Sequence, residues 1–581
     1  MAEKIKTACP LDCYDACSVI YMDGKLKGDK NHPVTRGFLC PHLNNYHKYK
    51  VLEKPKFRGK EISLEKAVSI LAEKLKSVKP ENVLHFRGSG NLGKMQEVTD
   101  LFFAKYGAVL TKGSLCDAAG QLGIENGRGR NIILPVEQIE KSELVVVWGR
   151  NIPVTNSHML PFLKDKIIAV IDPIKTDFAK RANIHLQINP GTDLELANMM
   201  ARFTIMQNEE AEEFVEEFCE DFDYYYDYLK SFRIVRTVEK IGVDILEIMT
   251  LQELMKDLKT VFLVGNGVQK YSNGTDTIRA IDSLAATLGL FGKEGCGVSF
   301  LGDTSAGLEN PFAVEAKRVN KAVVDFGNYD LCFIQGANPA NQNPASKDVR
   351  EGLEKSFTVY FGLYENETSE LSDLVIPAKN FLQKSDMRFS YGHEYVSFLP
   401  KIEENENALS EYELTKKLFD IFGFEGLKSE EEYLNIFKSQ LIEEEGLYKI
   451  PVYEKIPYKE GFYTDEEKFL FIEESEEGSL HEKEGLWLIT PKSKKSLNSQ
   501  FEREKYAYLH PSLGIKEGEK VKISSEYGEY IFETKIDDSL KENTVLIYSG
   551  TAGVNFITPR KTDEYGNGAV FQEVKLKIER V

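Results

Sequence analysis

No stretch of the 581-residue chain approaches the roughly 18 consecutive apolar residues that a membrane-spanning helix needs. The first residues, MAEKIKTACPLDC, also lack the apolar run of about 7–15 residues that marks a secretory signal, and no twin-arginine leader is present. We therefore expect a cytoplasmic protein without a direct membrane span. A leader removed by processing would leave no trace in this sequence.

Basic residues are fewer than acidic ones. The chain has 73 lysines and arginines and 92 aspartates and glutamates, which give a formal net charge of −19. Binding to a nucleic-acid backbone needs a basic surface, so the charge excludes nucleic acid as the main partner. The apolar content of 42% is too high for a disordered chain. The length corresponds to roughly three to five domains of ordinary size.

Cysteine is rare, and half of it lies in one short segment. Four of the eight cysteines follow the spacing C-x3-C-x3-C-x22-C, at Cys9, Cys13, Cys17 and Cys40. A reducing compartment makes disulfides the least favoured interpretation. Four soft thiolates suit a [4Fe–4S] cluster, whereas structural zinc usually takes its cysteines as two short pairs. The spacing therefore favours an iron–sulfur cluster, with zinc as the alternative.

A fifth cysteine, Cys116, lies in a different setting. Its surroundings, KGSLCDAAG (residues 112–120), are rich in small residues and predict a loop that enters a helix. A thiolate at a helix amino terminus is stabilised by the helix dipole. Taken alone, such a cysteine is more often structural than catalytic. Cys219, Cys296 and Cys332 are interpreted as small packing residues without chemistry.

No complete G-x-G-x-x-G fingerprint occurs, which disfavours a simple nicotinamide-binding domain. Instead, short β-branched runs that end in glycine or proline loops alternate with helical patterns, among them a helix over residues 63–78 capped by Ser63. The runs are NVLHFRGSG, ELVVVWGRN, KIIAVIDPIKT, TVFLVGNG, DLCFIQGANP, FTVYFGLYENET and SDLVIPAKN. They predict an α/β fold of parallel strands whose loops gather at a ligand-binding edge.

From residue 486 onward the sequence turns to short strands, which predict a small β-barrel. The chain is accordingly divided into an iron–sulfur domain over residues 1–60, an α/β region over 61–330, a second α/β region with a linker over 331–470, and the C-terminal barrel over 480–581.

Several blocks, in chain order, resemble the molybdopterin oxidoreductases of the dimethyl-sulfoxide-reductase superfamily. The resemblance spans nearly the whole chain. The blocks are CPLDCYDAC with GFLC, then WGRN, IDPIKT and NPGTD, then GNGVQKYSNG, GANPANQNP and ENETSELSDLVIPA, and finally LITPKSKKSLNSQF, SGTAGVNFITP and DEYGNGAVFQEVKLKIE.

The resemblance implies an N-terminal [4Fe–4S] segment, two Rossmann-like α/β domains around a pterin cleft, and a C-terminal barrel that caps it. It also implies a molybdenum or tungsten centre held by two molybdopterin guanine dinucleotides. Cys116 falls at the place of the protein's ligand to that metal, with Ser114 and Asp117 as alternatives. A soft thiolate suits a metal already bound by dithiolene sulfurs.

Polar and glycine residues of the matching blocks are the predicted contacts to the two dinucleotides. They are Asn151, Asp172, Thr176, Gly191, Asp193, Gly265, Gly267, Gly336, Asn338, Glu365, Asp373, Thr490, Ser499, Asn555 and Gln572.

This sequence departs from the family pattern at three places. Many members carry a lysine two residues after the last cluster cysteine, where this chain has His42, with Lys48 or Lys50 as substitutes. Formate dehydrogenases of the family place a histidine after the metal-binding residue and an arginine in a nearby loop, where this chain has Asp117 and Leu301. Asp117 is instead a candidate proton carrier, or else a helix cap.

The resemblance implies a molybdenum- or tungsten-dependent oxidoreductase that performs two-electron redox or oxygen-atom transfer on a small substrate. Electrons would pass through one [4Fe–4S] cluster to a separate electron carrier or ferredoxin-like partner subunit. A thiolate-ligated metal favours a polysulfide or thiosulfate reductase. The alternatives are a formate-dehydrogenase-like enzyme, a non-redox hydratase on the same scaffold, and a non-catalytic electron-transfer subunit of a larger complex.

Overall fold

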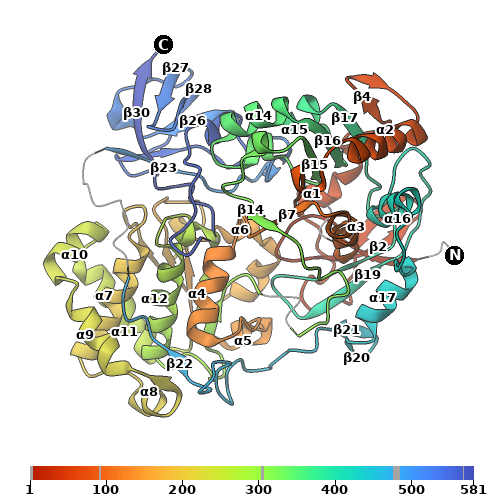
Figure 1. Cartoon of the computed structure of the whole chain (residues 1–581). Helices are drawn as coiled ribbons and strands as arrows, with labels where there is room; N and C mark the ends of the chain where they lie inside the picture. Colours follow the sequence, from red (N-terminus) through yellow and green to blue (C-terminus); the bar gives the residue numbers. More distant parts are fainter. Residues whose placement is uncertain (1–3, 90–92, 303–306, 476–484, 567) are drawn as a thin grey trace. The chain divides into compact units, whose positions relative to one another are not determined.

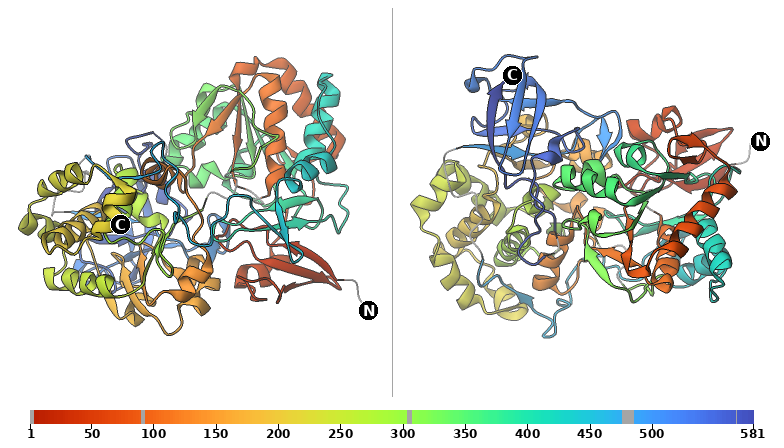
Figure 2. Two further views of the ribbon diagram at one scale, coloured as in Figure 1. Left: turned by 90° about the horizontal axis from the view of Figure 1, so that it is seen from below. Right: turned by 45° about the horizontal axis from the view of Figure 1, so that its top comes forward.

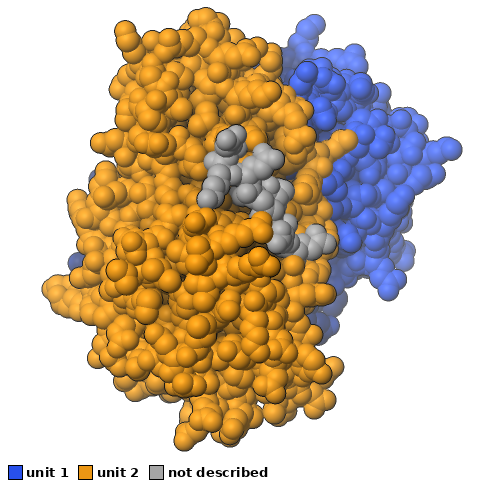
Figure 3. All heavy atoms as spheres, turned by 90° about the vertical axis from the view of Figure 1, so that its left-hand side faces the viewer, with its two compact units in different colours: residues 1–113, 304–452, 495–503 blue, residues 114–303, 453–494, 504–581 orange. Residues whose placement is uncertain are grey.

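Two compact units, each built from three separate segments, make up the computed structural model, which describes residues 4–89, 93–302, 307–475, 485–566 and 568–581. Unit 1 comprises residues 1–113, 304–452 and 495–503, and unit 2 comprises residues 114–303, 453–494 and 504–581 (Figure 3). Segments far apart in the sequence therefore share one core.

Unit 1 is built on an eight-stranded sheet (Figure 1). In spatial order its strands are β14 (Arg318–Asn320), β7 (Val109–Lys112), β6 (Val83–Arg87), β15 (Leu331–Gln335), β16 (Phe357–Gly362), β17 (Leu374–Pro377), β4 (Lys56–Phe57) and β5 (Lys60–Glu61). The first six are parallel, and β4 and β5 add antiparallel strands at one edge.

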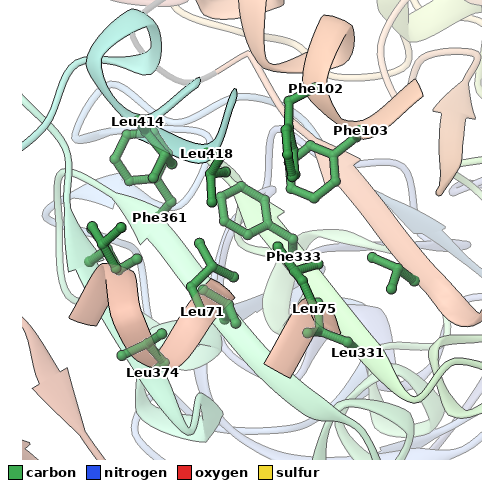
Figure 4. Close-up of a cluster of buried hydrophobic side chains, with 14 of the residues drawn as sticks. Leu71, Leu75, Phe102, Phe103, Leu331, Phe333, Phe361, Leu374, Leu414 and Leu418 are labelled. Atoms are coloured by element: carbon green, nitrogen blue, oxygen red, sulfur yellow. The ribbon is translucent and has the colours of Figure 1, made fainter. Parts of the chain in front are cut away.

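Alternation along the strands gives this sheet two apolar faces, as a sheet covered by helices on both sides requires. Leu331 and Phe333 of β15 point to one face, where they pack with residues of α2 (Leu64–Ser77), α3 (Thr99–Tyr106) and α16 (Glu411–Phe422) (Figure 4). Cys332 and Ile334 point to the other face, which α13 (Pro339–Gln342) and α14 (Ser346–Lys355) cover. Unit 1 also holds α1 (Pro41–Asn44), α15 (Glu367–Leu371) and α17 (Glu430–Lys438).

Three small antiparallel sheets complete unit 1. The first contains β1 (Ile5–Ala8), β2 (Ser18–Met22) and β3 (Lys25–Gly28). The second contains β18 (Asp386–Arg388), β19 (Tyr395–Leu399), β21 (Leu447–Lys449) and β20 (Ile442–Glu444), and the third pairs β24 (Ser496–Leu497) with β25 (Gln500–Phe501).

Unit 2 contains a five-stranded parallel sheet of order β10 (Ile184–Leu186), β9 (Ile167–Ile171), β8 (Leu144–Trp148), β12 (Thr260–Val264) and β13 (Gly297–Ser299). All five residues of β8 and of β12 are buried, as expected of strands covered on both faces. The α-helices of unit 2 are α4 (Ala118–Arg128), α5 (Val136–Lys141), α6 (Ile152–Thr155), α7 (Asp193–Met206), α8 (Glu212–Phe218), α9 (Phe222–Lys230), α10 (Ile234–Ile241), α11 (Ile245–Asp257) and α12 (Gly274–Thr287). A separate two-stranded sheet pairs β11 (Cys219–Glu220) with β22 (Phe469–Leu470).

The predicted C-terminal barrel is confirmed. The barrel is the blue part of the ribbon in Figure 2. It closes in the order β23 (Leu486–Ile489), β29 (Thr544–Leu546), β26 (Tyr506–Leu509), β28 (Glu529–Ile536), β27 (Lys520–Ser524) and β30 (Lys575–Arg580). Apolar side chains of these strands form its core. The hairpin of β24 and β25 interrupts it in the sequence and belongs to unit 1.

The α/β prediction is also confirmed, since each of the seven apolar runs contains a parallel strand and α2 is capped by Ser63, whose Oγ accepts a hydrogen bond from Lys66 N. The sheets nevertheless draw their strands from distant segments. β6 lies next to β15, whereas the sequence-based division placed β6 in the region 61–330 together with β8, β9 and β12. None of the described helices is long and apolar enough to span a membrane.

Candidate functional site

The four clustered cysteines lie at the ends of three elements of unit 1. Cys9 follows β1, Cys17 precedes β2 and Cys13 lies in the connection between them, while Cys40 directly precedes α1. The amide of Cys9 donates to the carbonyl of Cys17 at 2.8 Å, which closes the loop that carries Cys13. All eight cysteines lie in the described part of the chain, and none of them forms a disulfide.

Burial raises the pKa of each of these four thiols, that of Cys9 to about 12. The charge of Cys40 raises the pKa of Cys9, Cys13 and Cys17 further, so the four groups are electrostatic neighbours. Four neighbouring thiolates are unfavourable in an apolar core unless cations neutralise them. Within the described ranges, no three His, Cys, Asp or Glu side chains gather closely enough to hold one metal ion.

Residues from a segment far away in the sequence bind the backbone of the cysteine loop. Arg388 of β18 donates to the carbonyl of Leu11 at 3.0 Å and to that of Cys13 at 3.2 Å. His393 Nε2 lies 2.8 Å from the carbonyl of Asp15. Sequence reasoning missed both residues because nothing in the local pattern links positions more than 370 residues apart.

His42, the residue at the place of the family's lysine, lies in α1. Its ring stacks on Phe501 of β25, with ring centres 4.9 Å apart and planes inclined by 14°. Burial lowers its pKa, which favours the neutral imidazole. Lys48 and Lys50 are exposed. The structure thus places His42 against an aromatic ring two residues from Cys40.

Cys116 belongs to unit 2 and lies two residues before α4, so the predicted loop entering a helix is present. Ser114 Oγ accepts hydrogen bonds from the amides of Cys116, at 2.9 Å, and of Asp117, at 3.4 Å. Asp117 is the N-cap residue of α4, but no capping hydrogen bond to its side chain occurs among the described residues. Its carboxylate is therefore not used as a helix cap.

Two neighbouring side chains fix the backbone of this loop. Gln269 Nε2 donates to the carbonyl of Cys116 at 3.0 Å, and its Oε1 accepts from the amide of Gly120 at 2.5 Å. Lys270 Nζ donates to the carbonyl of Leu115 at 2.6 Å and also to that of Cys116. Neither residue was predicted, although both lie in the block GNGVQKYSNG. The Cys116 carbonyl is thereby held by two donors.

The carboxyl ends of the parallel strands in unit 2 gather several of the predicted cofactor-binding residues. Asn151 follows β8, Asp172 directly follows β9, and Gly265 and Gly267 follow β12. These loops meet at one edge of the sheet because the three strands are parallel neighbours. A Cβ on Gly265 would lie 2.3 Å from the carbonyl oxygen of Gly149, so glycine is needed there.

Two carboxyl side chains lie near this edge, the buried Asp193 and the half-buried Asp172. Asp193, the first residue of α7, accepts a hydrogen bond from Trp148 Nε1 at 2.7 Å, and Asp172 accepts one from the amide of Ile174 at 2.8 Å. Burial raises the pKa of both to about 7. Gly191, two residues before Asp193, has a φ of 74°, which suits glycine. The edge therefore offers two carboxyl groups that are readily protonated.

The other predicted contacts of unit 2 lie in several loops. Thr176 Oγ1 accepts a hydrogen bond from an amide of its own turn at 3.1 Å, and Thr490 follows β23. Asn555 is buried in a short helical turn of the barrel domain. Gln572 Nε2 donates to the carbonyl of Gly267 at 3.3 Å, so the structure brings Gln572 to the loop after β12.

In unit 1, Gly336 and Asn338 follow the carboxyl end of β15. Asn338 Nδ2 donates to Ser499 Oγ at 3.0 Å and to Glu367 Oε2 at 2.8 Å. Arg503 in turn donates to Glu367 Oε1 at 2.6 Å. The structure therefore brings Asn338 and Ser499 together, and it adds Glu367, which lies in a block used for the resemblance but was not predicted.

Glu365 and Asp373 do not join this group. Glu365 is exposed and pairs with Lys56 at 2.5 Å. Asp373 precedes β17, accepts from the amide of Thr358 at 3.2 Å and pairs with Arg58 at 3.3 Å. It thus lies at the amino end of its strand, at the sheet edge opposite Asn338. The sequence shows that a residue flanks a strand but not which edge its neighbours occupy.

Comparison with known families decides what kind of protein this is. Residues 52–420 match the family described as "Molybdopterin oxidoreductase", which is more than half of the chain. The chain belongs to this family. Residues 486–575, which form most of the barrel, match the family described as "Molydopterin dinucleotide binding domain". The resemblance is confirmed, and the protein is a molybdopterin-dependent oxidoreductase.

Several individual proteins are similar to this chain along much of its length. A probable oxidoreductase, YyaE of Bacillus subtilis, is 29% identical, with 84% of this chain and 80% of that protein aligned. The F420-dependent formate dehydrogenase subunit alpha of Methanocaldococcus jannaschii is 25% identical over 99% of both chains. A nitrate reductase of Shewanella frigidimarina is 24% identical, with 62% of this chain and 44% of that protein aligned.

The fold of this molybdopterin oxidoreductase is similar to that of acetylene hydratase from Pelobacter acetylenicus, with a TM-score of 0.79, 17% identity and full coverage of both chains. At that identity the likeness concerns the fold alone. Neither relative with a stated substrate is a sulfur-compound reductase. The comparisons therefore support a general molybdenum or tungsten oxidoreductase and not the predicted preference for sulfur compounds.

Proposed function

We propose that this protein oxidises or reduces a small substrate by two electrons at a molybdenum or tungsten ion held by two molybdopterin guanine dinucleotides, with Cys116 as the protein ligand. When bound, the metal supplies the two-electron exchange with the substrate. Cys116 suits this role because it lies just before the amino terminus of α4, where the helix dipole stabilises a thiolate. Gln269 and Lys270 keep its backbone in place.

Unit 2 has features that fit a polar dinucleotide. Asn156 Nδ2 and Thr551 Oγ1 are buried, and neither has a hydrogen-bond partner in the part of the chain that the structure describes. Buried polar atoms without partners are costly, so a ligand that pairs with them would stabilise the protein. Asp172 and Asp193 add carboxyl groups that can accept hydrogen bonds from a guanine base. The residues present therefore fit the cofactor class.

Unit 1 is proposed to hold one [4Fe–4S] cluster through Cys9, Cys13, Cys17 and Cys40. The observation that carries this proposal is the meeting of four disulfide-free thiols in and around one apolar cluster, where Cys40 raises the pKa of the other three. A cubane binds each of its four thiolates at a different iron atom, so four cysteines supply its full ligand set.

Asp117 is proposed to carry a proton to or from the substrate. It directly follows the metal ligand, and its carboxylate does not serve as a helix cap among the described residues. A positioned carboxylate can move the proton that accompanies a two-electron reaction. His42 is proposed to link the cluster to the pterin, because it lies two residues beyond Cys40 and its neutral ring can donate a hydrogen bond.

Formate is the second candidate substrate. The match to a formate dehydrogenase alpha subunit over 99% of both chains favours it. Asp117 and Leu301, which replace the histidine and arginine of that subclass, weigh against it. The substrates that we place before formate are polysulfide and thiosulfate, because they suit a metal with a thiolate ligand. The match to a nitrate reductase adds nitrate to the substrates for testing.

The deciding experiment is elemental analysis of protein purified without oxygen, followed by viologen-linked assays with polysulfide, thiosulfate, nitrate and formate. We expect about four iron atoms per chain, together with molybdenum or tungsten. Cys13→Ala should lose iron, whereas Cys116→Ala should keep iron and lose turnover. Cys219→Ala, which removes a buried thiol elsewhere, is the matched control.

The outcomes separate the assignments. A Cys116→Ala protein with full turnover would contradict the ligand assignment, and loss of turnover in Ser114→Ala alone would transfer it to Ser114. Zinc in place of iron would contradict the cluster. Iron without molybdenum or tungsten would indicate a non-catalytic electron-transfer subunit.

A further inference from the structure

The pairing of β1, β2 and β3 places lysines on one face of their sheet. Lys6 pairs with Ile20, and Ile20 pairs with Lys27, so the three side chains form one cross-strand row on the same side. Met22 and Lys25 form the next row on that side. Lys6, Lys25 and Lys27 are exposed, while Ile20 and Met22 are half-buried. This outward face therefore combines positive charge with apolar surface.

The opposite face of the same sheet packs on the cysteines. Val19, Tyr21 and Leu26 alternate with the outward residues and belong to the apolar cluster that contains Cys9 and Cys17. A single sheet thus separates the outward lysines from the four thiols. A charge carrier that rests on the outward face is one protein layer from the proposed cluster.

The charge of this region differs from that of the rest of the chain. The first 60 residues contain 12 lysines and arginines and 6 aspartates and glutamates, whereas the whole chain has 73 and 92. Lys6 is partly neutralised, because it pairs with Asp29 at 3.2 Å. Lys25 and Lys27 at the edge strand β3 are the clearer positive groups.

The loop before the fourth cysteine packs on the opposite side of this sheet. Gly28, the last residue of β3, pairs with Val19 and so shares the side that packs on the cysteines. A Cβ on Gly28 would lie 2.2 Å from the carbonyl oxygen of Gly37, three residues before Cys40. The segment that carries Cys40 therefore lies behind the sheet, and Lys25 and Lys27 point away from it.

We propose that the outward face of β1–β3 is the docking surface for an acidic one-electron carrier protein. The inference rests on the proposed function, since it assumes that Cys9, Cys13, Cys17 and Cys40 hold a redox cluster. Opposite charge steers the encounter, and the complex stays weak enough to separate after each transfer. Two carrier molecules dock in turn for each substrate molecule, and each exchanges one electron.

The test uses the loaded enzyme and a small acidic ferredoxin as the probe, with the same ferredoxin after amidation of its carboxylates as the charge control. The variant is K25E/K27E. The matched control is K575E/K577E, since Lys575 and Lys577 are also exposed lysines two residues apart on one strand. Ferredoxin binding is measured by titration calorimetry, and ferredoxin-linked and viologen-linked rates are measured on the same samples.

We expect K25E/K27E to lower kcat/KM for ferredoxin roughly tenfold and to weaken ferredoxin binding, whereas K575E/K577E changes neither. Added salt and amidated ferredoxin should reproduce the loss in the wild type. A K25E/K27E enzyme that binds ferredoxin as the wild type does at low salt would overturn the proposal.

If the proposed redox function itself is wrong, the same measurements give a different result from the one expected when only the docking surface is wrong. A wild-type protein without iron, or without viologen-linked turnover of any substrate, contradicts the proposed function whatever its charge dependence. Retained viologen-linked turnover with charge-independent ferredoxin binding contradicts only the docking surface.

Discussion

At the scale of single residues, the protein places carboxyl groups where they are costly when ionised. Asp193 is buried and accepts a hydrogen bond from Trp148, while the nearby Asp172 raises its pKa further. If these groups had no ligand to bind, replacing them with residues that do not ionise would raise the stability of the protein. Both residues lie at the strand ends where the sequence predicted cofactor contacts. The stability lost by placing carboxyl groups there is consistent with a role in binding.

The raised pKa of Asp193 predicts a pH-dependent stability of the cofactor-free protein. An aspartate whose pKa rises from about 3.9 in the unfolded chain to about 7 in the folded chain takes up a proton on folding. Its contribution is therefore lost as the pH rises from about 4 to about 7. We expect Asp193→Asn, which keeps the acceptor for Trp148, to show a smaller fall in the free energy of unfolding over this range.

Urea unfolding at several pH values measures this difference. Asp538→Asn, at an exposed aspartate of the same unit, is the control and should follow the wild type. Parallel pH curves for the wild type and Asp193→Asn would contradict the assignment.

At the scale of elements, the sequence predicted what depends on local pattern. The seven long apolar runs became strands because five or so β-branched and aromatic residues bury both faces. The shorter strands β7, β10 and β14 were missed, since three or four residues carry too weak a pattern. The neighbours of β6 and the edge on which Asp373 lies depend on pairing over hundreds of residues, which no local pattern encodes.

The close approach of the loops after β8 and β12 predicts a large effect of one methyl group. Gly265→Ala would place a Cβ 2.3 Å from a backbone oxygen of Gly149, and a backbone cannot yield as a flexible side chain can. We expect a loss of about 1–3 kcal/mol in the free energy of unfolding. Thermal unfolding of Gly265→Ala beside Gly327→Ala, whose Cβ would have its nearest neighbour at 3.4 Å, checks it. Equal melting temperatures would contradict the prediction.

At the scale of the whole molecule, the chain leaves and re-enters each unit. β6 and β7 come from the first segment of unit 1, whereas their sheet partners β14 and β15 come from the second. The barrel differs, because all six of its strands fall within residues 486–580 and surround their own core. The two regions should therefore differ in their capacity to fold alone.

We expect a fragment of residues 485–581 to unfold in one cooperative transition in urea, as a closed barrel with its own core does. A fragment of residues 1–113 should show no such transition, since β6 lacks its neighbour β15. Circular dichroism during urea titration of both fragments measures this. A non-cooperative barrel fragment, or a cooperative fragment 1–113, would contradict the argument.

The central place of β6 has a consequence for biosynthesis. A ribosome finishes β6 248 residues before it finishes β15, the strand beside it. During that interval the nascent chain displays an unpaired apolar strand edge, which is a template for aggregation. Chaperones that shield emerging chains should consequently be needed until the residues of β17 have left the exit tunnel, and only afterwards can the cysteine segment meet the β18 strand that holds its loop.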